Sequence, residues 1–414
     1  MSAWLNRRPC VFVPGLFTLS WRRRGFTLMA LALLAFSACG QKPEELALVG
    51  RDPGGHGVLC RFQNKKILIV DGTPEQMGAA HGRLLAEGAK DLTQRVIYGA
   101  GILGTLKKGV WFMDSMADIE LRTAPFLPER FLRECDALSE AAGMSTRDGR
   151  YANLFPELFH CSGVAARGRA TADGSVIHAR VLDYMSDIGL QKQATVIVFI
   201  PEGRIPWMAL SYAGFIGTVT AMNANGLAIG EIGGRGEGHW DGVPMAFLLR
   251  DVMERASTVT EGVAIIQNSR RTCEYYYVLS DKSKDMAGLA CTHEKIEVLL
   301  PGQQNPLLPP VPEDTVFISG DKRAVRLSQK LTETYGKIDV PTMMAIIKRP
   351  VAMNSNLHNA IFKPETLEMW VADAGKNTPA CDEPYVRVNL AELISFHNLQ
   401  KANPTVKPAP APKE

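Results

Sequence analysis

The chain has 414 residues, of which 46% are hydrophobic and 21% are charged, an ordinary composition for a globular protein. Its formal net charge is +3, but residues 1–38 hold five arginines and no acidic residue, which leaves 41 basic against 43 acidic residues in the remainder. This balance gives no indication of a nucleic-acid partner. The length suffices for one large layered domain or two smaller ones.

The N-terminal segment has the pattern of a targeting signal. A basic stretch that ends at Arg24 precedes an apolar run at residues 26–36, and small residues then lead to Cys39. An apolar run of about ten residues is typical of a signal peptide and too short for a transmembrane helix, which needs about 20 residues. Because Cys39 resembles the lipidated residue of a bacterial lipobox, we expect residues 1–38 to be a signal peptide and Cys39 to anchor the protein on the periplasmic side of a membrane. An ordinary cleaved signal or an uncleaved anchor is the alternative.

Residues 39–66 are expected to form a lipid-anchored linker, since they contain prolines and several glycines. One strand and two helical tracts should follow, at residues 67–71, 74–96 and 112–142. Thr73 has the position of a helix cap, and Gly143 that of a helix stop. Pro125 and Pro128 should interrupt the second tract.

After residue 175 the pattern alternates between strands and helices. The expected strands are residues 175–184, 195–200, 206–212, 217–222, 227–232, 275–280, 286–292 and 296–300. The expected helices are residues 245–256, 261–267, 323–335 and 342–347, and a hairpin should turn at residues 363–366. This order suits two packed sheets with helices outside them. The proline- and lysine-rich tail, residues 401–414, is expected to be disordered.

The segment from residue 160 to 184 carries the most informative pattern. Cys161 begins one strand, Asp173-Gly174 supplies the positive φ angles of a turn, and the returning strand brings Arg180 and Asp183. A thiol beside a guanidinium and a carboxylate can be ionised, held in place and used as a nucleophile. A buried, inert cysteine next to an ion pair is the alternative.

Three motifs in this segment resemble one family. Cys-Ser-Gly at residues 161–163, Thr-x-Asp-Gly at 171–174 and Arg-x-x-Asp-Tyr at 180–184 resemble the acyl-coenzyme A:6-aminopenicillanic acid acyltransferase family. That family belongs to the N-terminal nucleophile hydrolases and is related to choloylglycine hydrolases. The likeness extends from about residue 67 to 373 and implies an α+β fold, a four-layer αββα sandwich. It also implies self-cleavage between His160 and Cys161, into an N-terminal α-chain segment (67–160) and a β-chain (161–400).

The resemblance gives the role of Asp183, and the chemistry of such a nucleophile suggests roles for the other residues. Cleavage would give Cys161 a free α-amine, and because the pKa of an α-amine is about 7.7–8.0, it could take the thiol proton and return it to the leaving amine. Asp183 would orient this amine, and Arg180 would stabilise the thiolate or bind a polar part of the substrate. Asn223 would donate to the oxyanion, with a plain turn residue as the alternative. Related choloylglycine enzymes carry an asparagine that this chain lacks, so either Ser319 or a backbone amide substitutes for it here, or the geometry of the pocket differs.

Other reactive groups give weaker patterns. Cys273, Cys291 and His293 lack a second ligand pair at zinc spacing, so no metal is expected. The glycine-rich residues 233–238 lack the lysine and hydroxyl residue of a phosphate-binding loop. We expect a mobile loop near the pocket there, and no cofactor.

Together these patterns predict an envelope lipoprotein that hydrolyses a small amide, or transfers its acyl group, through a thioester on Cys161. Self-cleavage would make it a two-chain heterodimer. A catalytically silent lipoprotein that keeps the fold as a binding module is one alternative. A cysteine peptidase acting on cell-wall peptides is the other.

Overall fold

The computed structural model describes residues 46–101, 105, 111–154, 160–184, 186–234 and 238–403. The expected signal segment, the expected lipidation at Cys39 and the tail from residue 404 onward lie outside these residues. Among the described residues, no helix combines the length and the apolarity that crossing a bilayer requires.

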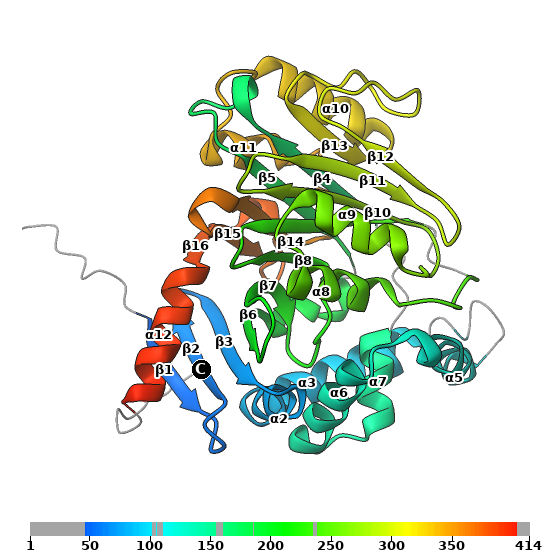
Figure 1. The fold of residues 1–414 in the computed structure, drawn as a ribbon, viewed down its shortest axis with the longest axis vertical. Helices are drawn as coiled ribbons and strands as arrows, with labels where there is room; N and C mark the ends of the chain where they lie inside the picture. The colour runs from blue at the N-terminus through cyan, green and yellow to red at the C-terminus, as the bar shows by residue number, and fades with distance from the viewer. Residues whose placement is uncertain are drawn as a thin grey trace, which may run out of the picture. The chain divides into compact units, whose positions relative to one another are not determined.

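Two sheets form the framework (Figure 1). The strands of the larger sheet are β1 (Ala47–Arg51), β2 (Gly57–Phe62), β3 (Lys65–Gly72), β6 (Ala194–Pro201), β7 (Trp207–Tyr212), β8 (Thr220–Asn223), β9 (Leu227–Gly233), β10 (Tyr275–Asp281), β11 (Met286–Cys291) and β12 (Ile296–Leu299). Those of the smaller sheet are β4 (His160–Ala166), β5 (Ile177–Asp183), β13 (Thr315–Ser319), β14 (Asn356–Lys363), β15 (Glu368–Asp373) and β16 (Val386–Asn389). The larger sheet follows the order β1-β2-β3-β6-β7-β8-β9-β10-β11-β12, and the smaller one β13-β4-β5-β14-β15-β16. The β3–β6 pair is parallel and the other pairs in these two orders are antiparallel.

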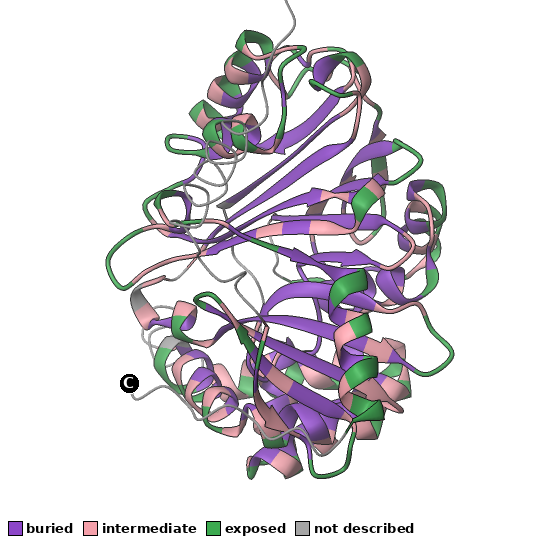
Figure 2. Cartoon of the chain, turned by 90° about the vertical axis from the view of Figure 1, so that its left-hand side faces the viewer, coloured by how far each residue is buried: buried purple, intermediate pink, exposed green. Residues whose placement is uncertain are grey.

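Helices cover the outer faces of both sheets. On the larger sheet, α2 (Pro74–Leu84) contacts β2, β3 and β6, α8 (Met245–Arg255) contacts β8 and β9, and α9 (Val259–Asn268) contacts β10. The other helices on this side pack on one another: α6 (Glu129–Ala142) on α2, α3 (Ala86–Thr93) and α7 (Thr146–Leu154) on α6, and α5 (Phe112–Thr123) on α7. On the smaller sheet lie α10 (Asp321–Glu333) and α11 (Val340–Ile347), and α12 (Leu390–Ala402) packs against β3, β6 and β16. The strands are buried along most of their length, whereas the helices keep exposed faces (Figure 2). The order helix, sheet, sheet, helix confirms the predicted α+β sandwich.

Local sequence signals explain several boundaries. Thr73 caps α2, because its Oγ1 accepts a hydrogen bond from the Gln76 N–H (3.3 Å) while Gln76 Oε1 accepts one from the Thr73 N–H (2.8 Å). Gly143 adopts φ 70° and ends α6 in the left-handed conformation. The predicted strand at residues 67–71 lies within β3. These elements form where the sequence predicted them.

The expected linker at residues 39–66 requires a correction. Residues 47–62 form β1 and β2, and the glycines and Pro53 make the turn between them, where the Asp52 N–H donates to the Gly57 carbonyl. Leu48, Val58 and Cys60 are buried in the core between the sheets. The turn residues resembled a linker, but the alternating apolar residues on both sides add two strands to the edge of the larger sheet.

Candidate active site

Strands β4 and β5 form the hairpin predicted around Cys161. Their register places His160 opposite Asp183, Cys161 opposite Leu182 and Gly163 opposite Arg180. The connection runs from residue 167 to 176 and is longer than a tight turn, although Gly174 takes the expected positive φ of 72°. The hairpin therefore brings the thiol, the guanidinium and the carboxylate together.

The thiol and the guanidinium both lie between the two sheets. A Cβ at Gly163 would lie 2.7 Å from Ile232 Cδ1, so this face of β4 contacts the larger sheet, and Cys161 shares the face because side chains alternate along a strand. Arg180 packs against the larger sheet at Gly230. A Cβ added to Gly230 would lie only 2.6 Å from Arg180 Cγ. Cys161 and Arg180 are 2% and 0% exposed.

Glu231 of β9 neutralises Arg180. The Nη2 of Arg180 lies 3.0 Å from Glu231 Oε2, and its Nε donates to the Glu231 carbonyl oxygen at 3.0 Å. Both side chains are fully buried. Burial raises the pKa of Glu231, whereas the guanidinium lowers it. Glu231 was not predicted, because it lies on another strand and in no local motif.

The thiol is held in its neutral form. Burial raises the pKa of Cys161 to about 12; Arg180 lowers it, Glu231 raises it further, and the Gly233 N–H lowers it by donating a hydrogen bond to the sulfur. A thiol with this pKa is protonated at neutral pH, so it needs a base to act as a nucleophile.

Asp183 is held by residues from two other elements. Its Oδ2 accepts a hydrogen bond from Arg323 Nη1 at 2.8 Å, and its Oδ1 accepts one from the Met353 N–H at 2.9 Å. Burial raises the pKa of Asp183 to about 6, against the lowering effect of the Met353 N–H and of Arg323. Arg323 lies in the first turn of α10. A cation in a first turn opposes the helix dipole, and this unusual position is the signal that could have pointed to it.

The structure corrects the role predicted for Asn223. Its amide nitrogen donates to the carbonyls of Met253 (2.9 Å) and Ala256 (2.7 Å), and its Oδ1 accepts from the Leu227 N–H at 3.0 Å. Gly233, at the thiol, lies at the opposite end of β9, which is six residues or roughly 20 Å away. Asn223 is therefore a turn residue, the alternative that its sequence context offered, and not an oxyanion donor.

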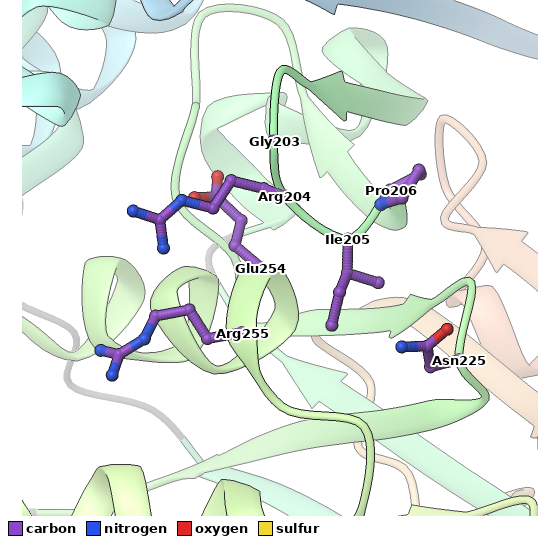
Figure 3. A pocket seen from close by; sticks show the side chains of 7 residues that line it. All are labelled: Gly203, Arg204, Ile205, Pro206, Asn225, Glu254 and Arg255. Carbon is purple, nitrogen blue, oxygen red and sulfur yellow. The ribbon is translucent and has the colours of Figure 1, made fainter.

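A surface pocket lies beside the turn between β8 and β9, away from the thiol. Asn225, two residues after Asn223, faces a cavity of about 630 Å³ that Arg204, Ile205 and Arg255 also line (Figure 3). The Ala224 N–H donates to the Pro206 carbonyl at 2.8 Å. These contacts tie the turn to the β6–β7 connection rather than to Cys161.

Ser319 also points away from the thiol. Its Oγ lies 2.6 Å from the Ser162 Oγ, and Ser162 occupies the face of β4 opposite to that of its neighbour Cys161. Of the two substitutes considered for the missing asparagine, the geometry favours a backbone amide, and the Gly233 N–H is already at the sulfur.

Metal-binding geometry is absent from the described part of the chain, where no group of three or more His, Cys, Asp or Glu residues could hold an ion. Cys273 and Cys291 line one small cavity and are not joined by a disulfide.

Comparisons with known proteins agree with the motifs. The model of the acyl-coenzyme A:6-aminopenicillanic acid acyl-transferase family matches residues 170–300, a range that includes Arg180, Asp183 and Glu231. The Dictyostelium discoideum proteins dcd1B and dcd1A are 24% and 25% identical over 379 and 356 residues, which cover 80% and 76% of this chain and 75% and 79% of theirs. The N-acylethanolamine-hydrolyzing acid amidase of Rattus norvegicus is 21% identical over 45% of this chain and 53% of its own.

Among solved structures, the Caenorhabditis elegans ortholog of that amidase superposes with a TM-score of 0.41 at 19% identity, covering 50% of this chain and 93% of its own. A penicillin V acylase from Agrobacterium tumefaciens gives 0.38 at 13% identity, covering 56% and 87%. The match at residues 170–300 confirms the predicted resemblance to the acyl-coenzyme A:6-aminopenicillanic acid acyl-transferase family.

Proposed function

We propose that this chain is an N-terminal nucleophile enzyme that hydrolyses a small amide, or transfers its acyl group, through a thioester on Cys161. The observation that carries the proposal is that the β4–β5 hairpin brings Arg180 and Asp183 to Cys161, with the Gly233 N–H at the sulfur. The family match and the relative named as an amidase support this reaction class.

The first step in the proposal is self-cleavage. The Cys161 sulfur attacks the carbonyl carbon of His160, a C–S bond forms, and the C–N bond to Cys161 breaks as its nitrogen takes up the thiol proton. Water then hydrolyses this thioester and leaves a carboxyl group on His160 and a free α-amine on Cys161. The register supports a role for Asp183 here, since it lies directly opposite His160.

Amide turnover uses the same groups. The α-amine takes the thiol proton, the sulfur attacks the substrate carbonyl carbon, and the carbonyl electron pair moves to the oxygen, which the Gly233 N–H stabilises. As the C–N bond breaks, the α-ammonium gives its proton to the leaving amine. Water or a second amine then releases the acyl group from Cys161, which yields hydrolysis or transfer.

Mass analysis of the purified protein tests the cleavage. We expect two associated fragments that meet at His160/Cys161, and a single uncut chain in Cys161→Ala. Cys60→Ala is the matched control, because Cys60 is another buried thiol whose pKa burial raises to about 12. That variant should be cut like the wild type.

A panel of N-acyl amides tests the chemistry. The cut protein should release amine, and hydroxylamine should trap the acyl group as a hydroxamate; added primary amine should divert the acyl group to a new amide if transfer is the natural reaction. An uncut chain whose Cys161 is never acylated by any amide would rule out the enzyme and favour a binding module of the same fold.

The location in the cell envelope is part of the same proposal. We expect Cys39 to carry a lipid that holds the mature protein at the periplasmic side of a bacterial membrane. Mass analysis of the N-terminal peptide would detect the acyl chains, and Cys39→Ala should move the protein from the detergent phase to the aqueous phase. An unmodified Cys39 in membrane-bound protein would contradict this.

A further inference from the structure

A buried histidine links the two sheets near the thiol. His358 of β14 is 0% exposed; its Nδ1 lies 2.8 Å from the Tyr212 Oη, and its Nε2 lies 2.9 Å from the Thr220 Oγ1. Tyr212 ends β7 and Thr220 begins β8, so both come from the larger sheet, whereas His358 comes from the smaller one.

His358 must be neutral in this position. Burial lowers its pKa well below the ordinary value, and the positive charges of Arg180 and Lys65 act in the same direction. A neutral imidazole has one N–H donor and one acceptor nitrogen. Its two hydrogen bonds therefore run in one of two directions, either from Tyr212 through the ring to Thr220 or from Thr220 through the ring to Tyr212.

The burial of Thr220 decides between them. Thr220 is 0% exposed, and among the described residues its hydroxyl has no hydrogen-bond partner other than His358. If Nε2–H donated to Thr220, the hydroxyl hydrogen of that threonine would be left unpaired in a dry site, which is costly. If Thr220 instead donates to Nε2, Nδ1–H donates to Tyr212, and the unused hydrogen is then on the partly exposed Tyr212.

The Tyr212 hydroxyl shares the inter-sheet space with the thiol. Cys161, Leu182 and His358 face one another in a row across β4, β5 and β14, and two strand spacings amount to roughly 10 Å. The Tyr212 ring stacks on the imidazole, with ring centroids 5.8 Å apart and planes at 22°. Burial raises the pKa of Tyr212 well above 10, with Asp373 acting in the same direction and Arg180 in the opposite one, so the hydroxyl keeps its proton.

We propose that Tyr212 is a further catalytic residue, whose hydroxyl donates a hydrogen bond to the amide carbonyl oxygen while Cys161 attacks the carbon. Together with the Gly233 N–H it would form the oxyanion site, and it would take the role that was predicted for Asn223. Thr220 and His358 are positioning residues that keep the tyrosine hydrogen available. The inference rests on the proposed function and involves no proton transfer from Tyr212.

Kinetics of the self-cleaved enzyme test the role. Tyr212→Phe should lower kcat roughly 10²- to 10³-fold, the usual effect of losing one oxyanion donor, with KM unchanged. Tyr98→Phe is the control, since its hydroxyl bonds Asp148 at the surface, and it should keep wild-type kcat. A wild-type kcat in Tyr212→Phe, or an effect on KM alone, overturns the proposal.

The positioning role of Thr220 and His358 has its own kinetic test. Thr220→Val keeps the volume but removes the donor to His358, which lets the ring take the other tautomer and accept the tyrosine hydrogen. We expect kcat to fall at least fivefold in Thr220→Val and to recover in Thr220→Ser. Equal activity of the two variants overturns the positioning role.

A spectroscopic readout does not depend on activity. In protein with ¹⁵N-labelled histidine, the His358 resonance, identified by its loss in His358→Gln, should show Nδ1 protonated and Nε2 unprotonated from pH 5 to 8. The opposite tautomer, or an imidazolium, overturns the inference even for a protein without amidase activity. Conversely, failure of Cys161 acylation with the expected tautomer present would contradict the proposed function and leave the hydroxyl geometry established.

Discussion

Arg180 and Glu231 form an ion pair with an Nη2–Oε2 distance of 3.0 Å, and neither side chain is exposed to solvent. The pair joins β5 of the smaller sheet to β9 of the larger one beside Cys161. It thus allows a guanidinium to remain next to the thiol although both side chains are buried.

We expect Glu231→Gln to destabilise the fold by about 3–5 kcal/mol, because the change leaves a buried guanidinium without its counter-charge. The pKa of Cys161 should fall, since the carboxylate raises it. Denaturant unfolding and the pH dependence of thiol alkylation in the uncut chain measure the two effects. In Glu313→Gln, which removes an exposed partner of Arg169, stability should stay within about 0.5 kcal/mol of the wild type; an equal loss there would refute the role of burial.

Asp183 should give the stability a distinct pH dependence. Its folded pKa of about 6 lies above the ordinary 3.8, so the folded chain binds this proton more tightly than the unfolded chain does. The free energy of unfolding should therefore fall as the pH rises from about 4 to 6, by roughly 3 kcal/mol from this group. Asp183→Asn should remove this component, while Asp285→Asn, at an exposed aspartate, should retain it.

The same carboxyl should set the acid limb of the activity. If ionised Asp183 orients the Cys161 amine, kcat/KM should rise with an apparent pKa near 6, the value to which burial raises Asp183. A pH–rate profile of the cut enzyme measures this limb. A profile that is flat between pH 5 and 7 would show that the charge on Asp183 is not required.

Asn223→Ala should affect stability and not chemistry. The change removes donors to the Met253 and Ala256 carbonyls and an acceptor for the Leu227 N–H, and unpaired buried groups cost about 1–3 kcal/mol each. We expect a loss of about 2–4 kcal/mol in unfolding experiments, with kcat per folded molecule unchanged. Asn225→Ala, which removes one half-exposed bond to Ser257, is the matched control. A kcat that collapses in fully folded Asn223→Ala would restore the oxyanion role.

Gly230→Ala should disturb the site through contact alone. The new Cβ would lie 2.6 Å from Arg180 Cγ and 3.0 Å from its Cβ, atoms close to the backbone that cannot swing away. We expect the free energy of unfolding to fall by about 1–3 kcal/mol and self-cleavage to slow down. Mass analysis over time measures the rate of cleavage. At Gly50 the nearest atom would be 3.5 Å away, so Gly50→Ala should cleave at the wild-type rate.

Local chemistry made part of the site predictable. The β4–β5 hairpin follows from the strand pattern and from Gly174, and it alone brings Cys161, Arg180 and Asp183 together. The α2 cap and the α6 stop follow from Thr73 and Gly143 in the same way. In each case the interacting residues are close in the chain or joined by one turn.

The remainder depends on contacts between distant segments. Glu231 and Arg323 reach the cluster from β9 and α10, and no motif near Cys161 records their presence. The role of Asn223 was predicted wrongly because the sequence of an Asn-rich turn is the same in both cases, whether its side-chain amides bind backbone carbonyls or a substrate. Helix α12 was not predicted because, of its apolar residues, only Leu390 and Leu393 are buried, too few to give a clear amphipathic pattern.

The parallel pairing of β3 with β6 has a consequence for assembly. Strands β1 to β3 precede Cys161 in the chain and form one edge of the larger sheet, whereas β6 and the strands beyond it follow Cys161. A cut at His160–Cys161 would therefore produce two polypeptides that share a single hydrogen-bonded sheet. Neither piece could leave without breaking a ladder through the hydrophobic core, so the two should fold once as a single chain and afterwards resist exchange with pieces made separately.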